Sequence, residues 1–152
     1  MEVSSIYTSP VLRAKQTAHI IGKSLVKDVF VDKRLRERYH GKLENHPTED
    51  GFWKLRMLSN SNLNVESWDS MAHRLRNFME SRKSPGKGAI VSVSHESVIL
   101  SLLSTTLGFD EFTGFSLKLR NASASIVEYG KRVKVLGFGM PVLTKDVLKK
   151  YK

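Results

Sequence analysis

Apolar and polar residues alternate along this chain with two periodicities, one typical of strands and the other of helices. Short runs rich in apolar and β-branched residues predict strands at 3–8, 26–31, 89–93, 124–129 and 132–138. Apolar residues at helical spacing predict helices from 9 to about 25, from 66 to 82 and from 97 to 107. Strands that alternate with helices predict an α/β three-layer sandwich with a mostly parallel central sheet.

The first helix has a start signal as well as a predicted buried face. Ser9 is a good N-cap and Pro10 suits the first helical turn, so we expect the helix to begin at this pair. The face that we expect to be buried consists of Leu12, Gln16 and Ile20 with their neighbours Ala14, Ala18 and Ile21.

The long helix and the strand at 89–93 are the strongest candidates for the core. One face of the helix carries Trp68, Met71, Leu75, Phe78 and Met79. The run 89–93 is largely apolar and β-branched, which is typical of a central strand covered on both faces. Around these elements we expect a polar loop at 34–50, a short helical segment at 52–58, and a C-terminal hairpin that turns at Gly130-Lys131.

The composition indicates one globular domain over residues 1–152. Of these residues, 40% are apolar, and the length suffices to bury a proper core. No apolar stretch is long enough to span a bilayer, and the first residues do not have the pattern of a secretory signal. Because the sequence also has no cysteine, we expect a cytoplasmic protein without disulfides or membrane association.

The net charge of +10 indicates an anionic partner. A phosphorylated small molecule and a nucleic acid would both suit it. The basic residues are scattered, apart from a tail with Lys149, Lys150 and Lys152, and no basic run alternates with aromatic residues as strand-binding surfaces favour. We therefore interpret most of this charge as solvated surface and do not expect a nucleic-acid partner.

Three polar segments follow predicted strands, at the place where parallel sheets bind ligands. Arg13 lies in the first turns of a helix, where a guanidinium can grip a phosphate through two parallel hydrogen bonds, although an ordinary surface arginine fits the same position. His95 follows the strand at 89–93 and can donate a proton to a phosphoryl oxygen, or simply cap the strand. Glu37 lies between two arginines in a loop and can act as a general acid, or form solvated ion pairs.

The motifs, in their order along the chain, resemble those of the histidine phosphatase superfamily, the phosphoglycerate-mutase-like family. Residues 9–18 contain Ser-Pro, Arg-Ala and Gln-Thr-Ala, and residues 93–95 read Val-Ser-His. Residues 35–44 resemble the family pattern Leu-x-Glu, three residues, Gly-x-Leu-Glu, with Asn45 where a glycine is common. The pair Glu-Ser at 66–67 with Arg74, and Asn-Ala-Ser at 121–123, extend the similarity over residues 3–138.

This resemblance implies that Arg13 and His95 bind the phosphate and that Glu37 donates a proton to the leaving oxygen. The attacking histidine of the family belongs to an Arg-His-Gly motif at the end of its first strand and is transiently phosphorylated. No Arg-His-Gly occurs in these 152 residues. We therefore expect an N-terminally truncated chain without the first strand, either through a shortened reading frame or through natural loss.

The four other histidines are poor substitutes for this nucleophile. His19 and His73 lie inside predicted helices, whereas His40 and His46 follow Glu37 at the expected mouth of the pocket. None follows a strand, and no two have the spacing of metal ligands. Neither these residues nor the resemblance implies a metal or an organic cofactor.

Two functions remain open, and both have a phosphorylated small molecule or a phosphate anion as the partner. One is a phosphomonoester phosphatase whose pocket is retained without the nucleophile; the short stretch from Glu37 to Val65 favours a phosphatase over a mutase. The alternative is a non-catalytic phospholigand-binding or regulatory domain. By the resemblance, the missing strand would also leave a gap between 89–93 and 124–129, which we expect to close by direct pairing or in a homodimer.

Overall fold

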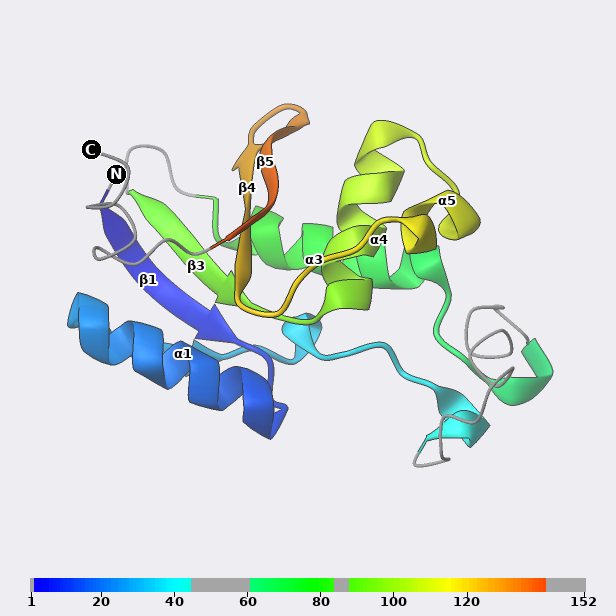
Figure 1. Ribbon diagram of the computed structural model, residues 1–152, viewed down its shortest axis with the longest axis horizontal. Helices are drawn as coiled ribbons and strands as arrows, with labels where there is room; N and C mark the ends of the chain where they lie inside the picture. Colours follow the sequence, from blue (N-terminus) through cyan, green and yellow to red (C-terminus); the bar gives the residue numbers. More distant parts are fainter. Residues whose placement is uncertain (1, 45–60, 84–87, 142–152) are drawn as a thin grey trace.

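A computed structural model describes residues 2–44, 61–83 and 88–141, and helices and strands alternate along it (Figure 1). The strands are β1 (Val3–Thr8), β2 (Val29–Val31), β3 (Ala89–Val93), β4 (Ser123–Tyr129) and β5 (Val133–Pro141). The α-helices are α1 (Leu12–Leu25), α3 (Trp68–Ser81), α4 (Glu96–Leu107) and α5 (Glu111–Ser116). Short 3₁₀ turns are η1 (Lys33–Leu35), η2 (Gly41–Leu43) and η3 (Ser61–Leu63). The short helix expected at 52–58 lies outside the described residues.

The three parallel strands are arranged in the order β2–β1–β3, which confirms the α/β class with a parallel sheet. Alternate residues of β1 face opposite layers, as the strand period requires. The side chain of Ile6 points toward α1, near Gly22, whereas the ring of Tyr7 packs edge-on against Phe78 of α3, with ring centroids 5.4 Å apart. The helices α1 and α3 therefore cover opposite faces of the sheet.

The prediction that residues 89–93 form a central strand is wrong for the part of the chain that is described. β1 occupies the centre, and β3 lies at one edge, where the side chain of Ile90 is 37% exposed. A run of apolar residues predicts a strand, but it does not determine which neighbours the strand pairs with.

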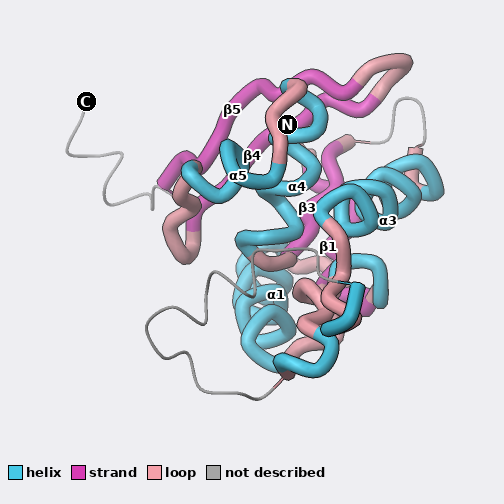
Figure 2. Tube along the Cα trace, turned by 90° about the vertical axis from the view of Figure 1, so that its right-hand side faces the viewer, coloured by secondary structure: helices cyan, strands magenta, loops and turns pink. Residues whose placement is uncertain are grey.

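The hairpin of β4 and β5 is antiparallel, as the turn at Gly130-Lys131 predicted. Among the described strands, β4 pairs with β5 and β3 pairs with β1, so the expected direct closure of β3 onto β4 is wrong. Figure 2 shows the hairpin at one end of the molecule and α1 at the other. Pairing through a homodimer stays a prediction.

The buried face of α1 agrees with the prediction at Ala14 and Ala18 but not at the larger apolar residues. Ala14, Ala18 and Gly22 are buried, whereas the side chains of Leu12 and Ile20 are 66% and 71% exposed. The small residues let the helix approach the sheet so closely that a Cβ atom at Gly22 would lie 2.8 Å from a methyl group of Val29. Close approach, rather than burial of the largest side chains, therefore sets the orientation of this helix.

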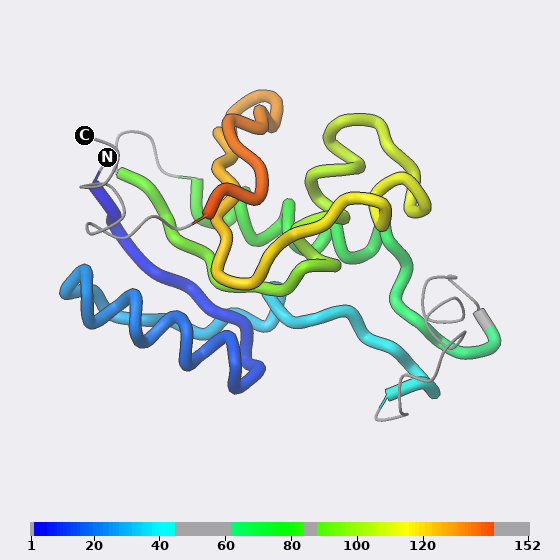
Figure 3. The backbone as a smooth tube through the Cα atoms, viewed as in Figure 1, coloured from blue at the N-terminus to red at the C-terminus, as the bar shows by residue number. Residues whose placement is uncertain are grey.

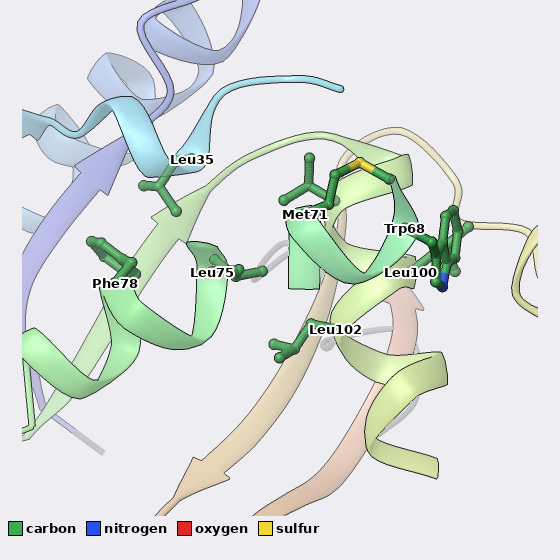
Figure 4. Close-up of a cluster of buried hydrophobic side chains, with 8 residues drawn as sticks. Leu35, Trp68, Met71, Leu75, Phe78, Leu100 and Leu102 are labelled. Atoms are coloured by element: carbon green, nitrogen blue, oxygen red, sulfur yellow. The ribbon is translucent and has the colours of Figure 1, made fainter. Parts of the chain in front are cut away.

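The main hydrophobic core lies between α3 and α4, as the predicted face of the long helix indicated (Figure 4). Trp68, Met71, Leu75 and Phe78 are buried there, and the indole N–H of Trp68 donates a hydrogen bond to Ser104 Oγ at 2.8 Å. Met79, expected on the same face, is partly buried against this cluster. Within residues 2–44, 61–83 and 88–141, every helix is too short or too polar to span a bilayer.

The segment after β2 brings the polar loop to the sheet. β2 is shorter than the predicted run 26–31 because Val26, with a φ of 52°, takes the left-handed conformation that ends α1. The chain then continues from Asp32 through η1 to Glu44 without a long helix or strand, and Figure 3 shows it in cyan, running away from α1. Because the segment has little regular structure, side chains from other elements must hold it in place.

Candidate active site

The structure brings together the three residues that the sequence singled out. Arg13 Nη2 lies 3.2 Å from Glu37 Oε2 and 3.1 Å from His95 Nδ1. The same carboxylate oxygen of Glu37 lies 3.3 Å from His95 Nδ1. One guanidinium, one carboxyl group and one imidazole therefore form a mutually contacting cluster.

The ends of two neighbouring parallel strands position this cluster. Arg13 is the second residue of α1, which begins shortly after β1 ends, and His95 is the N-cap residue of α4, two residues after β3. The two strand ends are joined by a hydrogen bond from the Ser9 N–H to the Val93 carbonyl oxygen, 2.9 Å long. Glu37 reaches the same edge from the segment that follows η1.

Ser9 is a partner of His95, which the sequence did not indicate. Its hydroxyl group was expected to cap α1, but the N-cap position is Val11, which has no side-chain cap. The Ser9 Oγ atom instead lies 2.8 Å from His95 Nε2 and accepts a hydrogen bond from the Val11 N–H. Both ring nitrogens of His95 thus have a hydrogen-bond partner, Ser9 at Nε2 and Arg13 at Nδ1, and Glu37 Oε2 lies beside Nδ1.

His95 is held in the neutral form by its surroundings. The residue is only 5% exposed, and burial, together with the positive charges of Arg13 and Arg74, lowers its pKa to about 4. With Nε2 protonated, the ring donates to Ser9 Oγ and accepts the Arg13 N–H at Nδ1, so all three groups are satisfied.

The cluster opens to solvent on the side of Arg13, whose side chain is 64% exposed, compared with 26% for Glu37. The first turn of α1 contains no acidic residue, so its dipole and free amide groups add positive potential near the guanidinium. Arg74 adds a second cation from α3. The exposed face of Arg13 is therefore a place where an anion can bind in exchange for the carboxylate of Glu37.

The other histidines that the structure describes lie in ordinary helical or loop contacts. His19 Nδ1 is bonded to the Lys15 carbonyl on the exposed face of α1, and His73 contacts Asn77 within α3. His40 belongs to the loop, where its N–H donates to a carboxylate oxygen of Glu44, and His46 lies outside the described residues. No group of three metal-ligating side chains gathers anywhere in residues 2–44, 61–83 and 88–141.

Comparison with known proteins identifies the family to which this chain is similar. The family model of the histidine phosphatase superfamily (branch 1) matches residues 1–137. A 2,3-bisphosphoglycerate-dependent phosphoglycerate mutase of Thermoplasma acidophilum is 31% identical over 99% of this chain and 75% of its own length. A probable phosphoglycerate mutase of Yersinia enterocolitica is 33% identical over 84% of this chain, which spans 64% of that relative, just under two thirds.

Solved structures show the same fold. Bacillus stearothermophilus YhfR matches 92% of this chain and 75% of its own, with a TM-score of 0.77 and 24% identity. A mycobacterial glucosyl-3-phosphoglycerate phosphatase, solved with inorganic phosphate, matches 90% of this chain and 77% of its own, with a TM-score of 0.72 and 22% identity. With the family model matching nine tenths of its length, and with the family's motifs meeting at one edge of the sheet, the chain belongs to the histidine phosphatase superfamily.

Proposed function

We propose that this chain forms the phosphate-binding and proton-donating part of a phosphomonoester phosphatase site. In this proposal Arg13 and His95 bind the phosphoryl group, and Glu37 supplies the proton to the leaving oxygen. The observation that carries the proposal is the convergence of these three side chains, within 3.3 Å of one another, at the carboxyl ends of β1 and β3.

The contacts within the cluster indicate how a phosphate would enter. Arg13 Nη2 now donates to the carboxylate of Glu37, a contact that a phosphoryl oxygen can replace because it accepts the same N–H group. His95 Nδ1 faces the same space and can bind a second phosphoryl oxygen when the ring is protonated. The carboxyl group of Glu37 would then border the ester oxygen, where a general acid acts.

None of the three groups is an attacking nucleophile in this arrangement. Both ring nitrogens of His95 are engaged, and the 152 residues contain no Arg-His-Gly. We therefore propose that these residues by themselves bind phosphate esters but hydrolyse them poorly. The short stretch between Glu37 and Val65 supports a phosphatase rather than a mutase, although the relatives compared by sequence carry mutase names.

Binding can be tested by calorimetric titration with orthovanadate, a phosphate mimic. Replacing Arg13 by Met should weaken vanadate binding about 10-fold or more, because hydrogen bonds to charged groups contribute ~1.5–3 kcal/mol. The matched control is Arg76→Met, which removes an arginine that bonds Thr105 Oγ1 away from the cluster. Equal affinity in the wild type and Arg13→Met would contradict the proposed phosphate site.

Hydrolysis of p-nitrophenyl phosphate separates the phosphatase from the non-catalytic alternative. The 152-residue chain should show very low turnover, and a chain extended by a strand that ends in Arg-His-Gly should show much more. An extended chain that binds vanadate without hydrolysing the ester would favour a phospholigand-binding domain instead. Strong turnover by the unextended chain, abolished by His95→Ala alone, would mean that His95 has a different role.

A further inference from the structure

Arg74 is largely buried on α3 and directs its guanidinium at the segment that carries Glu37. Its Nη1 atom donates to the carbonyl oxygen of Arg34 at 2.6 Å, and its Nη2 atom donates to the carbonyl oxygen of Glu37 at 3.3 Å. Both carbonyl groups belong to residues 34–37, which pair with no strand in the part of the chain that the structure describes. The side chain of Arg74 thus binds the segment at two points, Arg34 and Glu37.

Glu66, two residues before α3, binds both Arg74 and the same segment. Its carboxylate accepts hydrogen bonds from Arg74 Nε at 2.7 Å and Nη2 at 3.0 Å, and from the backbone N–H of Tyr39 at 3.1 Å. The backbone N–H of Glu66 in turn donates to the Tyr39 carbonyl oxygen at 2.8 Å. The Arg74–Glu66 ion pair, together with the backbone N–H of Glu66, therefore binds backbone groups of Arg34, Glu37 and Tyr39.

The ion pair is well shielded, with side-chain exposures of 19% for Arg74 and 14% for Glu66. Burying two charges costs desolvation energy that their attraction often only offsets, so such a pair is weak evidence for stability. Here its remaining hydrogen bonds all go to the segment that carries Glu37. Its physical consequence is a fixed position for that segment.

We propose that Arg74 and Glu66 are positioning residues that hold residues 34–39 so that the carboxyl group of Glu37 stays against His95 and Arg13. The catalytic role of Glu37 rests on the proposed function, whereas the positions of Arg74, Glu66 and Glu37 are observed in the structure. A lysine at position 74 keeps the charge yet cannot reproduce the planar fork that binds two carbonyl groups and a carboxylate together. Position 74 therefore requires arginine for its geometry.

The charged groups that face His95 come from three elements: Arg13 from α1, Glu37 from the segment after η1, and Arg74 from α3. Arg74→Lys keeps this set of charges, so it isolates the effect of position. The test is a double-mutant cycle at pH 7 that combines Arg74→Lys with Glu37→Gln. The signals are the ring ¹⁵N chemical shifts of His95, and no phosphate ligand is present, so a failure of phosphate binding does not affect the result.

In the wild type, Glu37→Gln should shift the ring nitrogen signals of His95 because it removes the carboxylate beside Nδ1. In the Arg74→Lys background the same change should produce about half that shift or less, because Glu37 no longer lies in place. In the Arg76→Met background the shift should be full-sized. A full-sized shift in Arg74→Lys would overturn the proposal, since a merely stabilising arginine leaves the contact between Glu37 and His95 intact.

Amide hydrogen exchange provides the second measurement, with Glu66→Gln as the milder variant. The amide of Tyr39, which bonds the Glu66 carboxylate, should exchange about 10-fold faster or more in Glu66→Gln and in Arg74→Lys, because local opening becomes easier. Amides of β1 should keep their wild-type rates. Unchanged exchange at Tyr39 in both variants would also overturn the proposal.

Discussion

Replacing His95 by Gln should remove part of the dependence of the free energy of unfolding on pH. In the folded chain, burial and the charges of Arg13 and Arg74 lower the pKa of His95 from its ordinary value of 6.5 to about 4. Between these two pH values the unfolded chain binds a proton that the folded chain does not bind. Acidification therefore favours unfolding, and the stabilisation that is complete above pH 6.5 is lost progressively down to pH 4.

The size of the effect follows from the difference between the two pKa values. A difference of about 2.5 pH units corresponds to ~3 kcal/mol, at 1.36 kcal/mol for each unit. At pH 5, where most of the unfolded but little of the folded chain carries the proton, the loss is about 2 kcal/mol. That is a large share of the ~5–15 kcal/mol that stabilises an ordinary domain.

Urea unfolding at pH 8 and pH 5, followed by tryptophan fluorescence, measures this effect. The wild type should lose about 2 kcal/mol more than His95→Gln between the two pH values. His19→Gln is the matched control, since His19 lies on the exposed face of α1 and its removal should leave the wild-type loss unchanged. The buffers must lack phosphate, because an anion bound beside the ring favours its protonated form. Equal losses in the wild type and His95→Gln would refute this reasoning.

Four further outcomes follow from the packing and the proposed site. Replacing Phe78, which is 2% exposed, by Ala should lower the free energy of unfolding by about 3–5 kcal/mol in the same unfolding experiment. Gly114→Ala should cost about 1–3 kcal/mol, because its Cβ atom would lie 2.6 Å from Trp68 Cζ2. Gly108→Ala, in open space at a φ of 80°, should cost only about 1–2 kcal/mol of backbone strain, so a larger loss there than at Gly114 would contradict the packing argument. Orthovanadate at 100 times its dissociation constant should stabilise the wild type by ~2.7 kcal/mol in thermal unfolding, and equal stabilisation of Arg13→Met would count against the proposed site.

Local patterns in the sequence were enough to predict the class of the fold and most of its elements. The β-branched runs at 3–8 and 89–93 form strands, and the apolar face of the long helix enters the core. The turn at Gly130-Lys131 closes the hairpin. These features are local, since strand and helix periods repeat within a few residues and a turn depends on its own residues. The order of three short motifs also predicted that Arg13, Glu37 and His95 would meet, because each follows a strand of one parallel sheet.

Only the tertiary structure decided which neighbours these elements meet. Leu12 and Ile20 are more apolar than Ala14 and Ala18, yet the small residues face the sheet because backbone approach depends on the surface opposite. β3 lies at an edge because strand order depends on pairing between distant segments, which no local pattern records.

The contacts around the site depend on tertiary structure for the same reason. The hydroxyl group of Ser9 bonds a ring 86 residues away, and Arg74 binds carbonyl groups 40 and 37 residues before it. A serine before a helix suggests a cap and an arginine on a helix suggests a solvated charge. Their actual partners are set by the way β1, α3 and α4 pack, because a hydrogen bond requires two groups to lie within about 3 Å, whatever their separation along the chain.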